Sequence, residues 1–86
     1  APRRKFTYKE QREFAVIEDE IAALEEELAG VKAGQEEKAS DYVALQALME
    51  RQEELEKALE EKMERWVYLT ELAQQMEQSD NERSEE

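Results

Sequence analysis

Apolar residues recur at alternating spacings of three and four over residues 14–31. They are Phe14, Ile17, Ile21, Leu24, Leu28 and Val31. This spacing places them on one stripe of an α-helix, of the kind that packs against another helix in a coiled coil. A second stripe follows at the same spacing, with two polar interruptions: Leu45, Leu48, Gln52, Leu55, Leu59, Lys62, Trp66, Leu69, Ala73 and Met76. Because neither helix can bury its stripe alone, the sequence predicts an all-α, antiparallel two-helix coiled-coil hairpin.

Local signals set the expected boundaries of this hairpin. Thr7 and Glu10 have the spacing of a capping box, which predicts that the first helix begins at Thr7. Gly30, Gly34 and the lack of periodic apolar residues from 33 to 39 favour a turn there, and Ser40 favours a new helix start. The expected organisation is a basic linker at 1–6 and a hairpin at 7–78 (helix 7–33, turn 34–39, helix 40–78). A disordered acidic tail is expected at 79–86, which has no apolar residue.

A fold about residues 36–37 sets the expected pairing of the two helices. It places Leu28 near Leu45 and Trp66 near Tyr8. The stretch from 67 to 78 then has no helical partner, although its apolar stripe continues. We therefore expect Phe6 to fold back onto Leu69 and to form an aromatic cluster with Tyr8 and Trp66.

The residue content excludes most catalytic chemistry. The chain has no Cys and no His, and no set of side chains combines a nucleophile with a base or forms a metal site. We therefore expect no enzyme activity, no catalytic residues, no cofactor and no metal in this chain.

No apolar run approaches the ~20 residues of a membrane span, and no secretory signal is present, so we expect a cytoplasmic protein without membrane contact. The chain begins with Ala rather than Met, which favours a fragment of a longer protein.

Charge is divided unevenly along the chain. The formal net charge is −12, yet residues 1–12 carry five basic side chains against Glu10, which is +4 and leaves −16 for the rest. The candidate nucleic-acid-binding residues are Arg3, Arg4, Lys5, Lys9 and Arg12. The same residues are also consistent with a solvated linker, and the negative charge of the rest of the chain opposes the binding of nucleic acid. Trp66 fits a hydrophobic anchor between the helices better than a platform for an unpaired base.

Several short segments carry a resemblance to a known family. Residues 5–13 (KFTYKEQRE) resemble the K-L-S-Y-K-E-Q-R-E opening of the C-terminal domain of ABC-F proteins, which are ATP-binding cassette proteins without a membrane part. Residues 40–42 (SDY), 45–49 (LQALM) and 63–66 (MERW) are similar to further segments of that domain. Thr7 replaces the usual Ser, Phe6 replaces Leu, and Tyr68 replaces an acidic residue. The resemblance covers roughly residues 5–76.

This resemblance implies a function that the residues alone do not. The chain would be a non-catalytic accessory domain of an ABC-F (Uup-like) ATPase, and the parent's cassettes would bind ATP and magnesium. It would bind nucleic acid, either DNA or ribosomal RNA on the ribosome. The alternative is a docking hairpin that contacts its own ATPase cassettes or a partner protein, which the acidic body favours. We expect a monomer, because both stripes are satisfied within one chain and the net charge opposes self-association.

Overall fold

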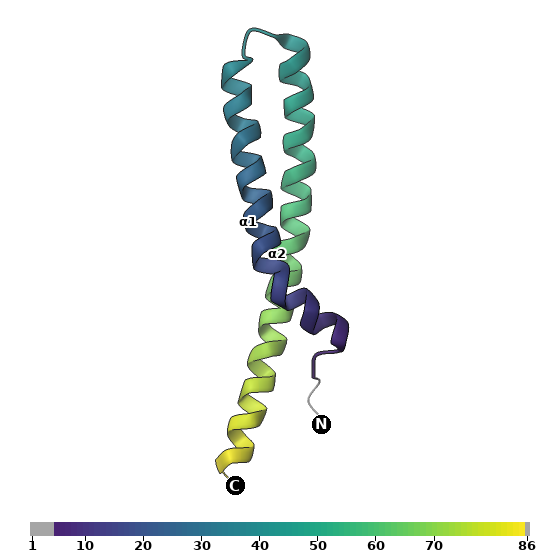
Figure 1. Cartoon of the computed structure of the whole chain (residues 1–86), viewed down its shortest axis with the longest axis vertical. Coiled ribbons are helices and arrows are strands. Elements are labelled where there is room, and N and C mark those ends of the chain that lie inside the picture. The colour runs from purple at the N-terminus through teal and green to yellow at the C-terminus, as the bar shows by residue number, and fades with distance from the viewer. Residues whose placement is uncertain (1–4, 86) are drawn as a thin grey trace.

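Two antiparallel helices form the whole described structure. A computed structural model describes the backbone of residues 5–85 and the side chains of residues 5–77. Helix α1 (Tyr8–Glu37) and helix α2 (Tyr42–Glu85) lie side by side as a hairpin that measures 68 × 17 × 17 Å (Figure 1). The predicted fold class is confirmed. No helix within the described residues is long and apolar enough to cross a membrane.

The predicted capping box opens α1. The Thr7 hydroxyl accepts a hydrogen bond from the backbone N–H of Glu10 at 3.1 Å, and the Glu10 carboxylate accepts one from the N–H of Thr7 at 3.0 Å. Two N–H groups that have no partner within the helix are thereby satisfied. The helix therefore starts at a fixed point, immediately after Thr7.

The predicted turn at 34–39 is wrong by about one helical turn. Helix α1 continues through both glycines to Glu37, and neither glycine has a positive φ. The chain reverses at residues 38–41, where the Lys38 N–H donates to the carbonyl of Gly34 at 2.9 Å. Asp41 then caps α2 by accepting from the N–H of Ala44 at 3.1 Å. The helical weakness of glycine is small, about 1 kcal/mol per residue, so contacts with α2 outweigh it.

The later turn changes the pairing of the helices. Trp66 donates its ring N–H to Glu18 at 3.2 Å, and Lys62 contacts Glu20 at 3.2 Å. Trp66 was expected level with Tyr8, and its hydrogen-bond partner lies ten residues further along α1. The pairing of the neighbouring Arg65 with Glu13 shows a smaller shift, of about five residues. The Gln52 interruption in the stripe meets Gln35, whose amide donates to it at 2.7 Å. Both polar interruptions in the second stripe thus have partners across the hairpin.

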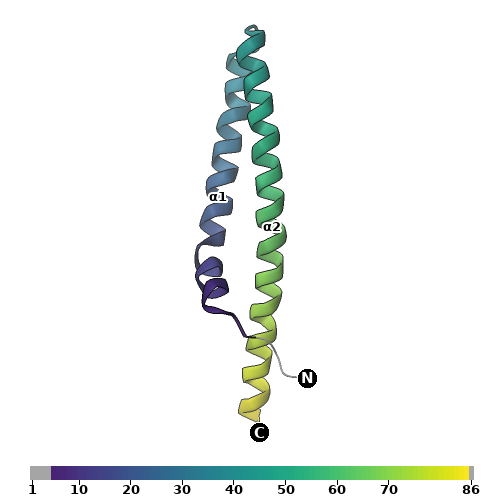
Figure 2. The ribbon, with the colours of Figure 1, turned by 90° about the vertical axis from the view of Figure 1, so that its right-hand side faces the viewer.

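The predicted stripes form the contact between the helices. Every position of both stripes is buried or half-buried. The least exposed apolar side chains are Ile17, Leu55, Leu69 and Leu72, at 0%, 2%, 0% and 5%. Three of them lie near the open end of the hairpin, where the first turns of α1 bend out of line with the rest of that helix (Figures 1 and 2).

The predicted aromatic cluster is wrong. The Phe6 ring contacts Phe14, with ring centres 5.4 Å apart, while Tyr8 is 76% exposed and Trp66 lies beside Glu18. The cause is the changed pairing, which carries Trp66 away from Tyr8. At the C-terminal end of α2, which lies at the same end of the hairpin as the start of α1 (Figure 1), the backbone continues as a helix through residues 79–85, where we expected a disordered tail. The side chains of that segment lie outside the described residues.

Candidate functional site at the open end of the hairpin

A buried carboxylate lies at the open end of the hairpin. Glu10 is 5% exposed. One of its oxygens accepts the Thr7 N–H, and the other lies 3.5 Å from the hydroxyl of Tyr68, which donates to it. A buried carboxylate needs such donors, because an unsatisfied buried charge is costly. Glu10, which completes the capping box of α1, therefore also contacts α2.

Arg65 joins the same cluster from α2. Its guanidinium donates to both oxygens of Glu13 at 2.8 and 3.0 Å, lies 3.9 Å from Glu10 and stacks on the ring of Tyr68 at 4.9 Å. The hydrogen bonds from Arg65 lower the pKa of Glu13, and the same contact raises the pKa of Arg65. This fork geometry fixes the angle at which α1 meets α2.

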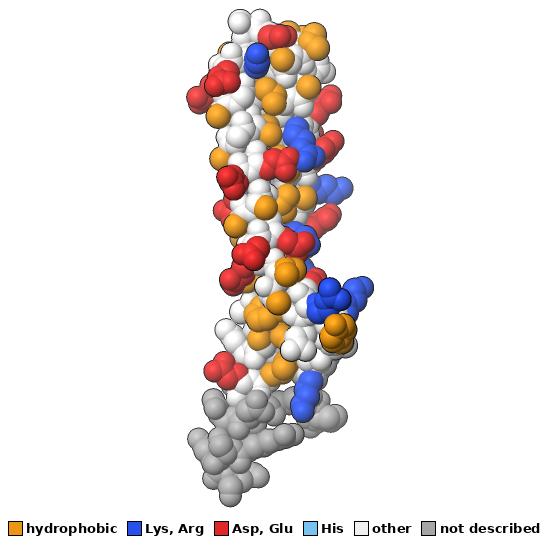
Figure 3. Space-filling view, viewed as in Figure 1, with side chains coloured by type: hydrophobic (Ala, Val, Ile, Leu, Met, Phe, Trp, Pro, Cys, Tyr) orange, Lys and Arg blue, Asp and Glu red, His pale blue; other side chains and the backbone are white. Residues whose placement is uncertain are grey.

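The predicted basic residues lie on the outside of this cluster. Lys5, Lys9 and Arg12 are exposed, and none of them forms an ion pair with another described residue. Arg12 lies over the ring of Tyr8 at 5.8 Å. Basic side chains gather over the first turns of α1 (Figure 3). Arg3 and Arg4 lie outside the described residues.

A shallow groove runs beside these cations. It has a volume of about 510 Å³ and is lined by Tyr8, Lys9, Arg12, Glu13 and Val16. An exposed aromatic ring beside two cations is suited to a phosphate with an attached base or sugar. Glu13 is the one acid in the lining, and its charge is already paired with Arg65.

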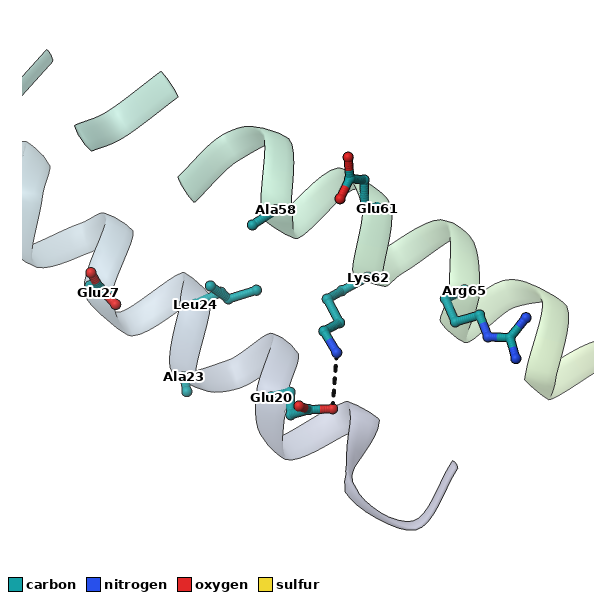
Figure 4. A pocket seen from close by; sticks show the side chains of 8 residues that line it. All are labelled: Glu20, Ala23, Leu24, Glu27, Ala58, Glu61, Lys62 and Arg65. Atoms are coloured by element: carbon teal, nitrogen blue, oxygen red, sulfur yellow. Dashed lines mark hydrogen bonds and ion pairs between the residues drawn. The ribbon is translucent and has the colours of Figure 1, made fainter. Parts of the chain in front are cut away.

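A second groove follows the contact between the helices. It has a volume of about 540 Å³ and includes Glu20, Leu24, Ala58 and Lys62 in its lining (Figure 4). Lys62 reaches across it to Glu20, so its charged end lies at the surface while its aliphatic part lies between the helices. No group of three or more potential metal ligands occurs in the part of the chain that the structure describes. This groove therefore offers paired charges over apolar side chains.

A third groove was missed at the sequence level. It lies on another side of α2, where Met63 and Val67 are 48% and 46% exposed. In the sequence Met63 lies one residue after Lys62 of the contact stripe, which gives no sign that a groove would form there. Which α2 side chains next to the contact stripe remain exposed depends on where α1 packs against α2.

Comparisons with known proteins agree with this architecture. Residues 5–71 match the family described as the ABC transporter C-terminal domain. The chain is also 37% identical over 75 residues to the "Uncharacterized ABC transporter ATP-binding protein YfmR" of Bacillus subtilis (strain 168). That match covers 87% of this chain and 12% of the relative's length. No solved structure matches the chain. These matches confirm the family resemblance in the motifs: this chain belongs to the family of ABC transporter C-terminal domains.

Proposed function

We propose that this chain is a non-catalytic accessory domain of an ABC-F ATPase, and that it binds nucleic acid through Lys5, Lys9 and Arg12, together with Arg3 and Arg4. One observation carries the proposal. Three exposed cations without described ion pairs lie at one end of a hairpin that is otherwise acidic. They belong to a helix start that the capping box and the Arg65–Glu13 contact hold in place.

The charge distribution determines how nucleic acid would approach. The acidic remainder, which includes Glu71 and Glu77 of α2 at the open end, repels phosphate, so contact is confined to the first turns of α1 and the residues before them. Glu10 does not offset the cations fully, because its carboxylate is buried and lies 3.9 Å from Arg65. Contacts from Lys and Arg to phosphates release counterions and carry no sequence information. The binding would therefore be insensitive to base sequence and sensitive to salt.

Charge reversal tests this proposal. We expect Lys9→Glu with Arg12→Glu to weaken binding to a fluorescent DNA duplex or single-stranded RNA in an anisotropy titration. For duplex DNA the slope of log affinity against log salt should fall by about 2, one for each lost contact. The matched control is Lys32→Glu with Lys38→Glu, which reverses two exposed cations near the turn. Equal loss in both variants would show a response to total charge and would contradict a site at the open end.

The parent protein is also part of the proposal. The chain spans 12% of the length of its Bacillus subtilis relative, whose printed name describes an ATP-binding protein. This supports a longer parent protein in which other domains bind ATP. Our proposal adds that the parent is cytoplasmic and that its cassettes use magnesium. The hairpin would act by position, as a stiff arm that brings the basic end to a distant contact.

Docking onto protein is the second candidate function. The observation that favours it is the exposed apolar surface of α2, where Met49, Met63 and Val67 are 53%, 48% and 46% exposed. Such side chains on a domain with an acidic body suit an interface with the parent's own cassettes or with another protein.

A further inference from the structure

An apolar groove with an acidic edge lies on α2 and shares no lining residue with the groove beside the basic side chains. Its volume is about 480 Å³, and Leu59, Met63 and Val67 of α2 line it together with Leu28 of α1. Glu56, Glu60 and Glu64 complete the lining and are all exposed. We call it the Met63 groove.

The groove has the period of a helix. Leu59, Met63 and Val67 recur every fourth residue, and so do Glu56, Glu60 and Glu64. Residues four apart lie one above the other on a helix, so the two sets form adjacent rows, one apolar and one acidic. Residues 56–67 extend over about 16 Å, which is three turns. A straight element of the same length would contact both rows at once.

No cation among the described residues pairs with the acidic row. Glu60 and Glu64 have no hydrogen bond or ion pair with any other described residue, and Glu56 accepts only a weak bond from the amide of Gln52 at 3.3 Å. Three acids that face the other helix differ, whereas exposed acids such as Glu25 are also without a described ion pair. Glu13 pairs with Arg65, Glu20 with Lys62 and Glu27 with Arg51. The Met63 groove therefore combines uncovered apolar surface with uncompensated negative charge.

We propose that the Met63 groove binds a cationic amphipathic helix of a partner protein. The partner's apolar residues would cover Leu59, Met63 and Val67, and its Lys or Arg side chains would pair with Glu60 and Glu64. The flexible side chain of Met63 adapts to different apolar shapes. The result would be a local three-helix arrangement, with the third helix lying along α2.

The charges of the groove argue against other occupants. A second copy of this chain would bring its own acidic α2 against Glu60 and Glu64, so like charges would oppose each other. Nucleic acid would meet the same repulsion. The proposal does not depend on nucleic-acid binding, because it uses a different surface and charge of the opposite sign.

The three methionines provide a direct readout. Met49, Met63 and Met76 lie at different levels of α2, so labelled methyl groups give one NMR signal for each. The probe is a synthetic helical peptide of about 14 residues made of Leu and Lys, with Leu on one face. We expect the Met63 signal to shift during titration of the whole 86-residue chain, while those of Met49 and Met76 stay in place. A dominant shift at Met49 or Met76 would overturn the proposal.

Matched variants distinguish peptide binding in the groove from a general attraction between the peptide and exposed apolar side chains. Met63→Gln with Val67→Gln should weaken peptide binding about tenfold or more, whereas Met49→Gln with Val43→Gln should change it by less than about twofold. Val43 and Met49 are at least as exposed, at 77% and 53%, but lie outside the groove. Since all four side chains are exposed, we expect every variant to fold, which circular dichroism would check.

Charge variants complete the test. Glu60→Gln with Glu64→Gln should weaken binding more than Glu36→Gln with Glu37→Gln, which removes the same charge near the turn. Equal losses would overturn the proposal, as would equal affinity for a peptide with Glu in place of Lys. Concentration-dependent Met63 shifts without peptide would instead identify a second copy as the occupant. Lys9→Glu with Arg12→Glu should leave peptide binding intact or slightly stronger, which distinguishes this proposal from the nucleic-acid one.

Discussion

Glu13 on α1 accepts two hydrogen bonds from the guanidinium of Arg65 on α2, at 2.8 and 3.0 Å. The residues are 52 positions apart in the chain, so the contact fixes the pairing of the helices near their open end. It also has an electrostatic consequence. The hydrogen bonds from Arg65 lower the pKa of Glu13 in the folded chain.

The first prediction follows from this pKa. A carboxylate whose pKa is lowered by folding contributes stability above its unfolded pKa of about 4.3, and that stability is lost as pH falls through the folded value. We expect Glu13→Gln to lower the free energy of unfolding by about 0.5–1 kcal/mol at neutral pH, a modest value because both partners are partly exposed. The difference from the wild type should shrink below about pH 4. Urea denaturation at several pH values measures it.

A control is needed because the acidic chain also changes its overall repulsion with pH. Glu25→Gln removes an equal charge from an exposed position with no described ion pair. It should leave stability at neutral pH unchanged or slightly raised. If both variants lose the same stability at neutral pH, the Glu13–Arg65 contact is not the cause.

The second prediction concerns the core. Ile17 is fully buried, so Ile17→Ala should lower the free energy of unfolding by about 2–4 kcal/mol, through lost burial and the cavity that remains. The neighbouring Val16 is 48% exposed, and Val16→Ala should change stability by less than about 0.5 kcal/mol. Thermal melting followed by circular dichroism compares them. Similar losses would contradict the orientation of α1.

The third prediction concerns Gly30, which lies inside α1 rather than in a turn. A Cβ atom added at Gly30 would meet nothing within 4 Å, so Gly30→Ala should stabilise the chain by about 0.5–1 kcal/mol. At Gly34 a Cβ would lie 3.4 Å from a methyl of Leu48, so Gly34→Ala should gain less. Destabilisation by Gly30→Ala would indicate that the chain is not helical at this position.

The main features of the fold could be predicted because they are periodic. Apolar spacing identified every position of the two stripes, and Thr7 with Glu10 identified the start of α1. The turn was misplaced because Gly30 and Gly34 are weak local signals, and packing against α2 outweighs them. One misplaced turn then moved every cross-helix pair, including Trp66 with Glu18.

The candidate sites were predictable only in part. The basic character of Lys5, Lys9 and Arg12 is visible in the sequence, and the structure adds their exposure. The buried position of Glu10 and its contact with Tyr68 depend on the bend of α1 across α2, for which no Pro or Gly gives a sign. The Met63 groove similarly depends on which side of α2 is left uncovered by α1.

The fourth prediction concerns association. Both apolar stripes are satisfied within one chain, and the formal net charge of −12 opposes contact between copies. We therefore expect a monomer in sedimentation equilibrium at micromolar concentration. A mass close to 20 kDa, twice the 10.1 kDa of one chain, would instead indicate a dimer.

The last prediction concerns the contact between Phe6 and Phe14. Their rings lie 5.4 Å apart and tilted by 54°, a geometry in which two aromatic rings attract each other. The contact ties the segment before α1 to the second turn of the helix, and so it limits the positions of Lys5. We expect Phe6→Ala to lower the free energy of unfolding by about 1 kcal/mol and to lower the NMR order parameter of Lys5. Tyr8→Ala is the control for stability and for the order parameter, because that ring is 76% exposed. If the nucleic-acid proposal is right, Phe6→Ala should also weaken binding without removing a charge, since an ordered cation loses less entropy on contact. An unchanged order parameter at Lys5 would show that Phe6 does not position the basic segment.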